Sequence, residues 1–535
     1  MPQSTSSSGV GPPSGPGSPA RASVTPSPGS DPAPGTVPSP PGPAALPDAI
    51  AGAVTFGASG AVLVLEITAL RLIAPYVGIT METNTAVIGL ALAAIALGAW
   101  SGGATADRRE PRGLLGPLMI LGGALTLAIT PAVRWVAAAA PPAESAGLAL
   151  MLAVVTVFAP AAVLSAIPPM VVKLQLAALT ETGAVVGRLS AIGTLGAIAA
   201  TFLTGFVLVA LVPTSIILTS TGVLLVAAGL ALVLSARRHG IAEGMSTTGA
   251  LVLAVVAGGL GLVAPDPCDV ETRYHCASVV ADADRSSGRT LVLDTLRHSY
   301  IDLEDPTYLE FDYVRAIAGA LDAHAPAGEP LDVLHVGGGA MTLPRYLLAT
   351  RPEGHNTVVE IDPGIVEVDR ERLALPDSDR LEVRVADGRI EVSRLPTDSY
   401  DVYVGDAFGG IAVPWHLTTR ETFADIDRVL RPGGLVALNI IDFGDLGFLA
   451  AEIATVRSVF PNLIVYQQTE RPNGGGNFVV LASHDPLDED RVGAAVRAQR
   501  APMAAMSSRR VNALEVTADV LTDDHAPVDQ LVSQS

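Results

Sequence analysis

Long apolar runs in the N-terminal half of the chain constrain its fold more than any other feature. They lie near residues 50–74, 84–102, 114–136, 146–166, 185–208, 213–234 and 248–264. A helix needs about 20 apolar residues to cross roughly 30 Å of hydrocarbon, where only helices and closed barrels satisfy every backbone hydrogen bond. The runs therefore predict an α-helical transmembrane bundle of about seven helices over residues 48–265, in which the last run is short and rich in glycine.

The overall composition agrees with a membrane protein and argues against one class of partner. The chain is 49% hydrophobic and only 16% charged, which is too apolar for an ordinary soluble enzyme. Its net charge is −20. Nucleic acid is therefore not expected as a partner, because phosphate binding needs clustered lysine and arginine. The lipid bilayer is the partner that the apolar runs predict.

Residues 1–47 consist almost entirely of proline, serine, glycine and alanine. Such a segment cannot bury enough apolar surface to offset its chain entropy, so we expect a disordered tail. It lacks the charged and apolar regions of a signal peptide.

Basic residues between the runs predict which side of the membrane each loop occupies, because lysine and arginine concentrate on the cytoplasmic side. One set of alternate loops contains Arg108, Arg109, Arg112, Lys173, Arg188, Arg237 and Arg238. The other set contains little beyond Arg71 and Arg134. The N-terminus is therefore predicted in the cytoplasm, and seven spans would place everything after Ala264 outside the cell membrane. A change of one span would reverse that side.

The chain has two cysteines, Cys268 and Cys276, directly after the last apolar run. His275 is adjacent, but a zinc site would need further ligands that the neighbourhood does not offer. A disulfide suits the predicted extracytoplasmic side, and two free thiols are the alternative.

The C-terminal half has a different pattern. Short alternating runs over residues 266–305 predict a small β unit, and residues 306–535 predict an α/β domain. Within that domain, strands are expected at 331–336, 357–361, 381–385, 400–405, 433–440, 462–468 and 475–482. Because helical segments fall between most of them, we expect a doubly wound, Rossmann-like parallel sheet of the methyltransferase type, with ligands beyond the carboxyl ends of its strands.

A glycine-rich turn follows the first of these strands, at Gly337, Gly338 and Gly339. Glu360 ends the next strand, about 20 residues later, where an acidic side chain accepts hydrogen bonds from ribose hydroxyls in nucleotide-binding folds. Thr342 stands where a third glycine would complete the usual motif. A plain glycine-rich turn is the alternative, but Asp387 and Asp406 at two further strand ends favour a nucleotide site.

Together, the segments DVLHVGGG, VVEIDPGIVEV, VRVADGR, YDVYVGDAF and RVLRPGGLVALN resemble the spermidine synthase family of polyamine aminopropyltransferases. The apolar runs resemble the membrane-fused branch of that family, and the resemblance covers roughly residues 50–531. It implies decarboxylated S-adenosylmethionine as cosubstrate, an amine or polyamine as the other substrate, and a role in polyamine biosynthesis. No tightly bound cofactor and no metal are expected.

The resemblance also implies a role for individual residues. Gly337, Gly338 and Gly339 would line the tail of the nucleotide, Glu360 would bind the ribose and Asp387 the adenine amino group. Asp362 and Gly388 would complete the nucleotide site. Asp406 would be the catalytic aspartate, which takes a proton from the attacking amine as methylthioadenosine is released. His298 and His416 lie in loops that could face the substrate.

The sequence departs from the family in the half of the site expected to bind the amine. Ala340 replaces an aspartate, Gly409 replaces a second aspartate, and the expected Tyr-His pair is not found, with Glu310 and Phe311 near its place. Two alternatives are therefore kept. One is methyl transfer from S-adenosylmethionine, and the other is a non-catalytic polyamine-binding or transport-coupled module. The oligomeric state is left open, a homodimer included.

Overall fold

The computed structural model describes residues 46–77, 81–139, 151–176, 182–242, 244–294, 296–408, 413–470, 475–516 and 518–532. The chain divides into two compact units, Met1–Ala44 and Ala45–Ser535, and every element below belongs to the second. The disordered tail predicted for residues 1–47, apart from its last two residues, and the substitution at Gly409 lie outside the described residues.

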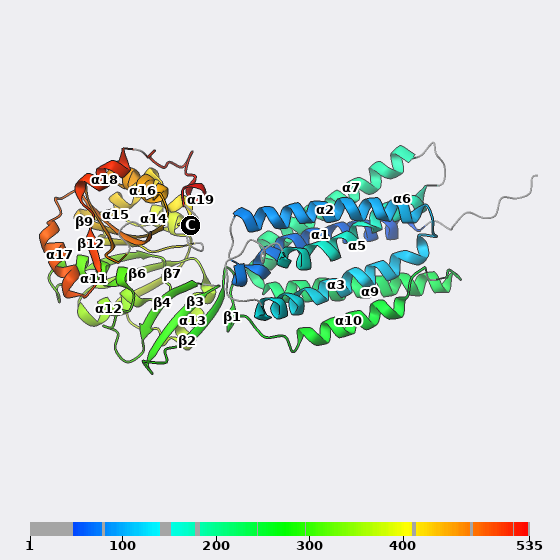
Figure 1. The fold of residues 1–535 in the computed structure, drawn as a ribbon, viewed down its shortest axis with the longest axis horizontal. Helices are drawn as coiled ribbons and strands as arrows, with labels where there is room; N and C mark the ends of the chain where they lie inside the picture. Colours follow the sequence, from blue (N-terminus) through cyan, green and yellow to red (C-terminus); the bar gives the residue numbers. More distant parts are fainter. Residues whose placement is uncertain are drawn as a thin grey trace, which may run out of the picture. The chain divides into compact units, whose positions relative to one another are not determined.

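The apolar runs form helices that lie alongside one another (Figure 1). They are α1 (Asp48–Val77), α2 (Met81–Ala106), α3 (Arg112–Ala139), η1 (Val154–Phe158), α5 (Ala159–Ser165), α6 (Ile167–Gln175), α7 (Thr182–Phe202), η3 (Leu203–Leu208), α8 (Val209–Leu211), α9 (Thr214–Arg238) and α10 (Thr247–Gly261). Among the described residues, 6 continuous helical segments are long and apolar enough to cross a membrane. Each corresponds to one of the first six predicted apolar runs.

The seventh predicted run differs from the others. It forms α10, which has only 15 residues and is shorter than a membrane span requires. Its flanking residues nevertheless contact opposite ends of α3. The Gly244 N–H donates to Gly113 O at 3.1 Å, and Arg134 pairs with Asp266 at 2.6 Å. The chain from Gly244 to Asp266 therefore runs along most of α3, partly as non-helical residues.

The remaining helix ends form two groups by their contacts. At one end, Lys173 pairs with Asp107 at 2.8 Å and Arg188 with Asp48 at 3.0 Å. At the other end, the Arg71 guanidinium donates to Val209 O at 3.4 Å. The basic loops thus gather with the start of α1, at the end of the bundle away from Arg71.

The small β unit is an antiparallel sheet in the order β1-β2-β3-β4. Its strands are β1 (Val270–Glu271), β2 (Cys276–Ala281), β3 (Gly288–Leu293) and β4 (Leu296–Asp302). The predicted β unit is therefore present between the helices and the α/β domain.

The α/β domain contains an 8-stranded sheet in the order β12-β10-β11-β9-β8-β5-β6-β7. Its strands are β5 (Asp332–Val336), β6 (His355–Glu360), β7 (Leu381–Val385), β8 (Tyr400–Gly405), β9 (Leu430–Asp442), β10 (Asn462–Gln468), β11 (Gly476–Ser483) and β12 (Met503–Ala505). Its helices are α11 (Asp312–His324), α12 (Thr342–Thr350), α13 (Pro363–Arg372), α14 (Gly388–Arg394), η4 (Trp415–Leu417), α15 (Arg420–Val429), α16 (Gly447–Arg457), α17 (Glu489–Ala498), α18 (Ser508–Glu515) and α19 (Val528–Leu531).

The predicted Rossmann-like α/β fold is confirmed, although its sheet is mixed rather than wholly parallel. Strands β5 to β9 run parallel, as expected, whereas β10, β11 and β12 pair antiparallel with their neighbours. A parallel crossover needs about a dozen residues or more, and the connection between Gln468 and Gly476 is too short for one.

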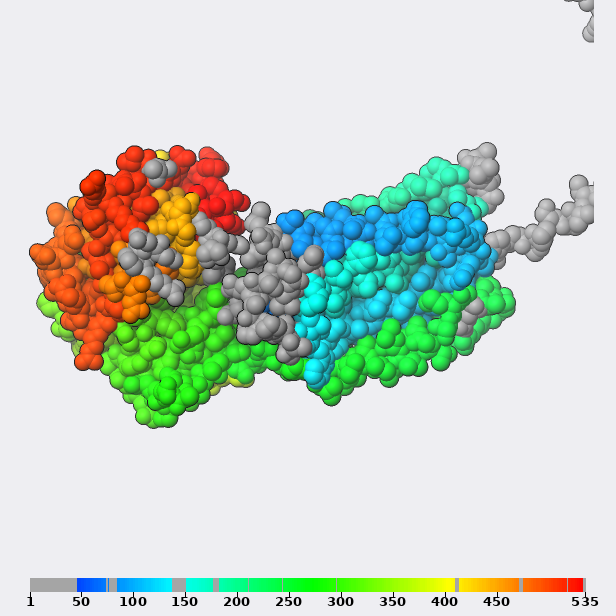
Figure 2. Space-filling model, viewed as in Figure 1, coloured from blue at the N-terminus to red at the C-terminus, as the bar shows by residue number. Residues whose placement is uncertain are grey.

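Apolar side chains pack on both faces of this sheet. One cluster joins α15 and α16 to the sheet, and another joins α11, α12 and α17. Segments from the early and late parts of the domain form one continuous surface (Figure 2).

The strand order reverses between β5 and β8, and ligands of such sheets bind at the carboxyl ends beside this reversal.

Candidate active site

A cavity of about 830 Å³ opens at the carboxyl ends of the parallel strands. It brings together most of the residues that the sequence analysis singled out, namely Gly337, Gly338, Gly339, Glu360, Asp387, Gly388, Asp406, His298 and His416. Asp362 is not among the residues that line it. The cavity is therefore the candidate active site.

The glycine loop brings the ends of β5 and β8 together. Gly337 has a φ of +97°, and a Cβ there would lie 2.2 Å from the carbonyl oxygen of Asp406. The Gly338 N–H donates to the Glu360 carboxylate at 2.8 Å. The loop can take this course because glycine tolerates a positive φ and lacks a side chain where the two backbones approach.

Glu360 is anchored rather than mobile. Its side chain is largely buried, and the Asp362 N–H donates to its other oxygen at 2.9 Å. Burial raises the pKa of Glu360, and the two backbone N–H donors oppose that rise. The carboxylate is thus fixed beside the glycine loop, where it can accept further hydrogen bonds from a ligand in the cavity.

Asp387 and Gly388 begin helix α14 beside the cavity. The Asp387 side chain caps the helix by accepting from the Ile390 N–H at 3.0 Å. His416 lies 3.5 Å from the other Asp387 oxygen, so it contacts the adenine side of the predicted site rather than Asp406. A Cβ at Gly388 would lie 2.6 Å from Val336, which explains glycine at this position by packing.

Asp362 was predicted to help form the nucleotide site, but its side chain does not line the cavity. It is 1% exposed and caps α13 by accepting from the Gly364 N–H at 2.9 Å. Its other oxygen accepts a hydrogen bond from the Thr272 hydroxyl in the β unit. In the segment VVEIDPGIVEV, Asp362 is therefore a helix cap and not a side chain that faces the cavity.

Asp406 follows β8, and its side chain is held by residues from two other elements. The Tyr313 hydroxyl donates to one carboxylate oxygen at 3.1 Å, and the Asn439 amide donates to the other at 2.8 Å. Asn477 in turn donates to the Asn439 oxygen at 2.9 Å. Burial raises the pKa of Asp406 to about 6, and the two hydrogen bonds oppose this rise. Asp406 is thus ionised at neutral pH and more basic than an exposed aspartate.

Sequence reasoning missed these supporting residues. Tyr313 has the helical spacing of the apolar face of its helix, and burial raises its pKa well above the usual value, so its hydroxyl stays protonated and donates. Asn439 and Asn477 are polar residues in otherwise apolar strands. An isolated polar side chain in a buried strand was the available signal, because such a group needs a partner.

The part of the cavity predicted to bind the amine has its own arrangement. Glu310 accepts a hydrogen bond from Tyr308 at 2.6 Å, and the Arg297 guanidinium lies 5.3 Å from the centre of the Phe311 ring. Ala340 is buried, and its N–H donates to Ser299 at 3.1 Å. No carboxylate therefore occupies the position that the family fills with aspartate.

Two histidines line the cavity near the β unit. Burial, and secondarily the nearby His275, lowers the pKa of His298 to about 4, so it is neutral at neutral pH. His275 contacts Asp294 at 2.8 Å. Across the described ranges, no group of three or more side chains is arranged to hold a metal ion.

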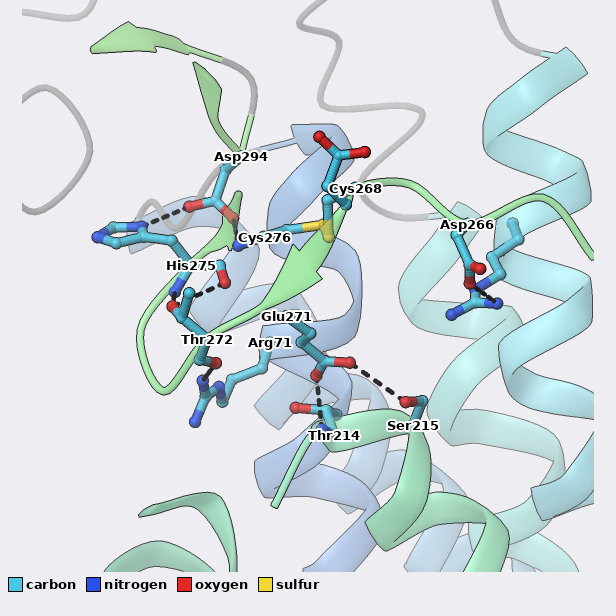
Figure 3. The surroundings of a disulfide bond; sticks show 12 residues. Arg71, Thr214, Ser215, Asp266, Cys268, Glu271, Thr272, His275, Cys276 and Asp294 are labelled. Atoms are coloured by element: carbon cyan, nitrogen blue, oxygen red, sulfur yellow. Dashed lines mark hydrogen bonds and ion pairs between the residues drawn. A yellow bond between two sulfur atoms is a disulfide. The ribbon is translucent and has the colours of Figure 1, made fainter. Parts of the chain in front are cut away.

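Cys268 and Cys276 form a disulfide with a Cα–Cα distance of 5.5 Å (Figure 3). The loop that it closes, residues 268–276, contains His275 of the cavity wall and Thr272. We call this segment the disulfide loop.

Replacing Tyr313 with phenylalanine should leave less of Asp406 in its ionised form near neutral pH, while the phenyl ring still fills the same space. The change removes a hydrogen bond to the ionised carboxylate, so the pKa of Asp406 should rise further and the acid limb of a pH–rate profile should move to higher pH. A charge-assisted hydrogen bond of this kind is worth about 1.5–3 kcal/mol, so a rate loss of about tenfold or more is expected near neutral pH. A profile that keeps its wild-type midpoint would contradict this role. Tyr346→Phe, which removes a hydroxyl bonded to Gln499 outside the cavity lining, is the control.

Comparison with known proteins gives relatives for part of the chain. A polyamine aminopropyltransferase from Vibrio vulnificus is 32% identical over 175 residues, which cover 32% of this chain and 56% of that protein. Polyamine aminopropyltransferase 2 from Pseudomonas aeruginosa is 33% identical over 169 residues, or 30% of this chain and 48% of that protein. An N-terminal histidine N-methyltransferase from Emericella nidulans is 27% identical over 215 residues, or 37% and 38% of the two chains.

The chain spans about half the length of the curated aminopropyltransferases that it matches. A crystal structure of a probable spermidine synthase from Corynebacterium glutamicum is 28% identical, with a TM-score of 0.45, and the match covers 48% of this chain and 97% of that one. No protein-family model matches the chain. The chain is thus similar over part of its length to polyamine aminopropyltransferases, and also to N-methyltransferases.

Proposed function

We propose that this protein is a membrane-bound transferase that moves an aminopropyl group from decarboxylated S-adenosylmethionine to an amine. The observation that carries the proposal is the placement of Asp406. It is a partly buried carboxylate in the same cavity as the glycine loop, Glu360 and Asp387. One side of the cavity can thus hold an adenosine, and the other presents a base.

The chemistry follows from the geometry of Asp406. A protonated amine is not a nucleophile, so it must first lose a proton to a base within hydrogen-bond reach. Asp406 would accept that proton while the nitrogen lone pair forms a bond to the propyl carbon next to the sulfonium. The carbon–sulfur bond breaks, its electrons return to sulfur, and neutral methylthioadenosine leaves. Tyr313 and Asn439 keep the carboxylate ionised and oriented, and binding two reactants in line supplies much of the remaining rate.

Methyl transfer from S-adenosylmethionine is the second candidate function. Ala340 favours it, because an alanine at this position cannot pair with the ammonium group of an aminopropyl tail. The related N-terminal histidine N-methyltransferase gives this alternative a precedent among the relatives.

Thermal stability with three ligands would distinguish the candidates. A ligand that binds only the folded state raises the melting temperature by mass action. Greater stabilisation by decarboxylated S-adenosylmethionine than by S-adenosylmethionine is expected, and methylthioadenosine should also stabilise as the product. The reverse order would support methyl transfer. No shift with any of them would leave the non-catalytic polyamine-binding or transport-coupled module.

We also propose that the bundle spans the cell membrane and that the α/β domain lies on its extracytoplasmic side. The support is the gathering of the basic loops, with ion pairs at Lys173 and Arg188, at the end of the bundle that contains the start of α1. The α/β domain follows the opposite helix ends, and a disulfide suits an oxidising compartment.

Single added cysteines should report the two sides. We expect an impermeant maleimide to label Glu353→Cys, an exposed position of the α/β domain, on intact cells, and to label Arg109→Cys only after lysis. The native cysteines, joined in a disulfide, provide an unlabelled background. Labelling in the reverse pattern would place the α/β domain in the cytoplasm.

A further inference from the structure

We infer that Thr272 of the disulfide loop is a positioning residue for ribose binding, which acts through Asp362 on Glu360 and is itself held by Arg71 of α1. The inference rests on the proposed function only in taking Glu360 as the ribose ligand. It assigns a role in the site to a residue that does not line the cavity, and it connects the site to the apolar helices.

The contacts toward the cavity form a continuous series. The Thr272 hydroxyl donates to Asp362. The Asp362 N–H donates to one oxygen of Glu360 at 2.9 Å, and the Gly338 N–H donates to the other at 2.8 Å. Because the Asp362 side chain is also bonded to Gly364 at 2.9 Å, a shift of Asp362 would move both the start of α13 and the carboxylate of Glu360. A Cβ at Gly364 would lie 2.8 Å from Thr272, so the two segments approach without a spacer.

The contacts toward the helices involve the same residue (Figure 3). The Arg71 guanidinium donates to Thr272 O at 3.3 Å and to the neighbouring Arg273 O. Glu271, the preceding residue, accepts from the Thr214 N–H at 2.5 Å and the Ser215 hydroxyl at 3.2 Å at the start of α9. A carboxylate at a helix N-terminus is stabilised by the helix dipole, so Glu271 is a firm attachment for the loop.

The disulfide and several hydrogen bonds constrain the disulfide loop, so a displacement of the loop should also displace Asp362. The disulfide closes the loop, and inside it the Thr272 N–H donates to His275 O at 2.8 Å while the His275 N–H donates to the Thr272 hydroxyl at 2.9 Å. Asp294 accepts from the Cys276 N–H at 3.0 Å and contacts His275 at 2.8 Å. One hydroxyl thus connects the turn to Asp362.

The matched test is a pair of substitutions at Thr272. Thr272→Val has the same shape but no hydroxyl, whereas Thr272→Ser keeps it. Dissociation constants would be measured by calorimetry, on full-length protein in lipid nanodiscs, for methylthioadenosine and for its 2′,3′-dideoxy analogue. We expect Thr272→Val to weaken methylthioadenosine binding about tenfold, the effect of losing one hydrogen bond in a charged network, and to leave the dideoxy analogue unchanged. Thr272→Ser should bind both ligands like wild type.

Arg71→Gln extends the test into α1. It should reduce the preference for the ribose hydroxyls in the same direction, and adding it to Thr272→Val should have little further effect, because the two residues act in series. Additive losses in the double variant would overturn the connection to α1.

Three other outcomes have distinct meanings. If wild type binds methylthioadenosine with a ribose preference that Thr272→Val retains, the inference is wrong and the proposed function stands. Equal losses for both ligands would show a general structural effect and also overturn the inference. If wild type binds neither ligand, the proposed function fails, and the role of Thr272 fails with it.

Discussion

Replacing Asp406 with asparagine is expected to reduce group transfer by at least about a hundredfold, the lower end of what a positioned general base contributes. Asparagine has nearly the same volume but cannot accept the proton from the attacking amine. Adenosine binding should persist, because Glu360 ends β6 and Asp387 caps α14, away from the end of β8. The measurements are the transfer rate under single turnover and the dissociation constant of methylthioadenosine.

The pH dependence of the wild-type rate gives an independent check of the same residue. Burial raises the pKa of Asp406 to about 6, and only the carboxylate form can accept a proton. The rate should therefore rise with pH through about 6 and then level off as far as this group is concerned. Asp425→Asn, at a carboxylate paired with Arg389 outside the cavity lining, is the control and should keep the wild-type profile. Full transfer activity in Asp406→Asn would remove Asp406 from the mechanism.

The second large effect is expected from Gly337→Ala. The substitution places a side chain on a residue with φ of +97° and puts a Cβ 2.2 Å from the Asp406 carbonyl oxygen. Relief of that contact requires the ends of β5 and β8 to separate, which would displace both the glycine loop and Asp406. We expect a loss of about 3 kcal/mol or more in stability and loss of measurable transfer.

Gly328→Ala is a matched control for the backbone strain. Gly328 has a φ of +90°, but a Cβ there would meet nothing within 4 Å. Its substitution should cost about 1–2 kcal/mol from the left-handed conformation and leave the activity intact. Melting temperatures and transfer rates of the two variants would separate strain from steric contact. Equal effects of both would show that the close approach to Asp406 is unimportant.

The residues at the ends of parallel strands could be placed from the sequence. Glu360, Asp387 and Asp406 each lie at or just beyond the end of a predicted strand, and the carboxyl ends of parallel strands meet at one edge of a sheet. Their meeting in one cavity therefore required only the strand pattern. The six long apolar helices were predictable for a similar reason, because length and composition alone decide whether a helix can cross a bilayer.

The other parts of the site depend on contacts between distant segments, which no local pattern encodes. Tyr313 reaches Asp406 across a sequence separation of 93, and Thr272 reaches Asp362 across 90. Asn439 is recognisable as polar, but its partner is set by the pairing of β8 and β9. The antiparallel strands were missed because the strand periodicity of a sequence does not show direction.

The disulfide loop also has a consequence for how ligand and bundle affect each other. Arg71 contacts the backbone of Thr272, and Thr272 contacts the helix cap beneath Glu360. If the helix arrangement changes the affinity for adenosine, thermodynamic reciprocity requires that adenosine shift the helix arrangement by the same free energy. Ligand binding to an α/β domain attached in this way would therefore change the arrangement of the apolar helices, and a change in that arrangement would change the affinity for the ligand.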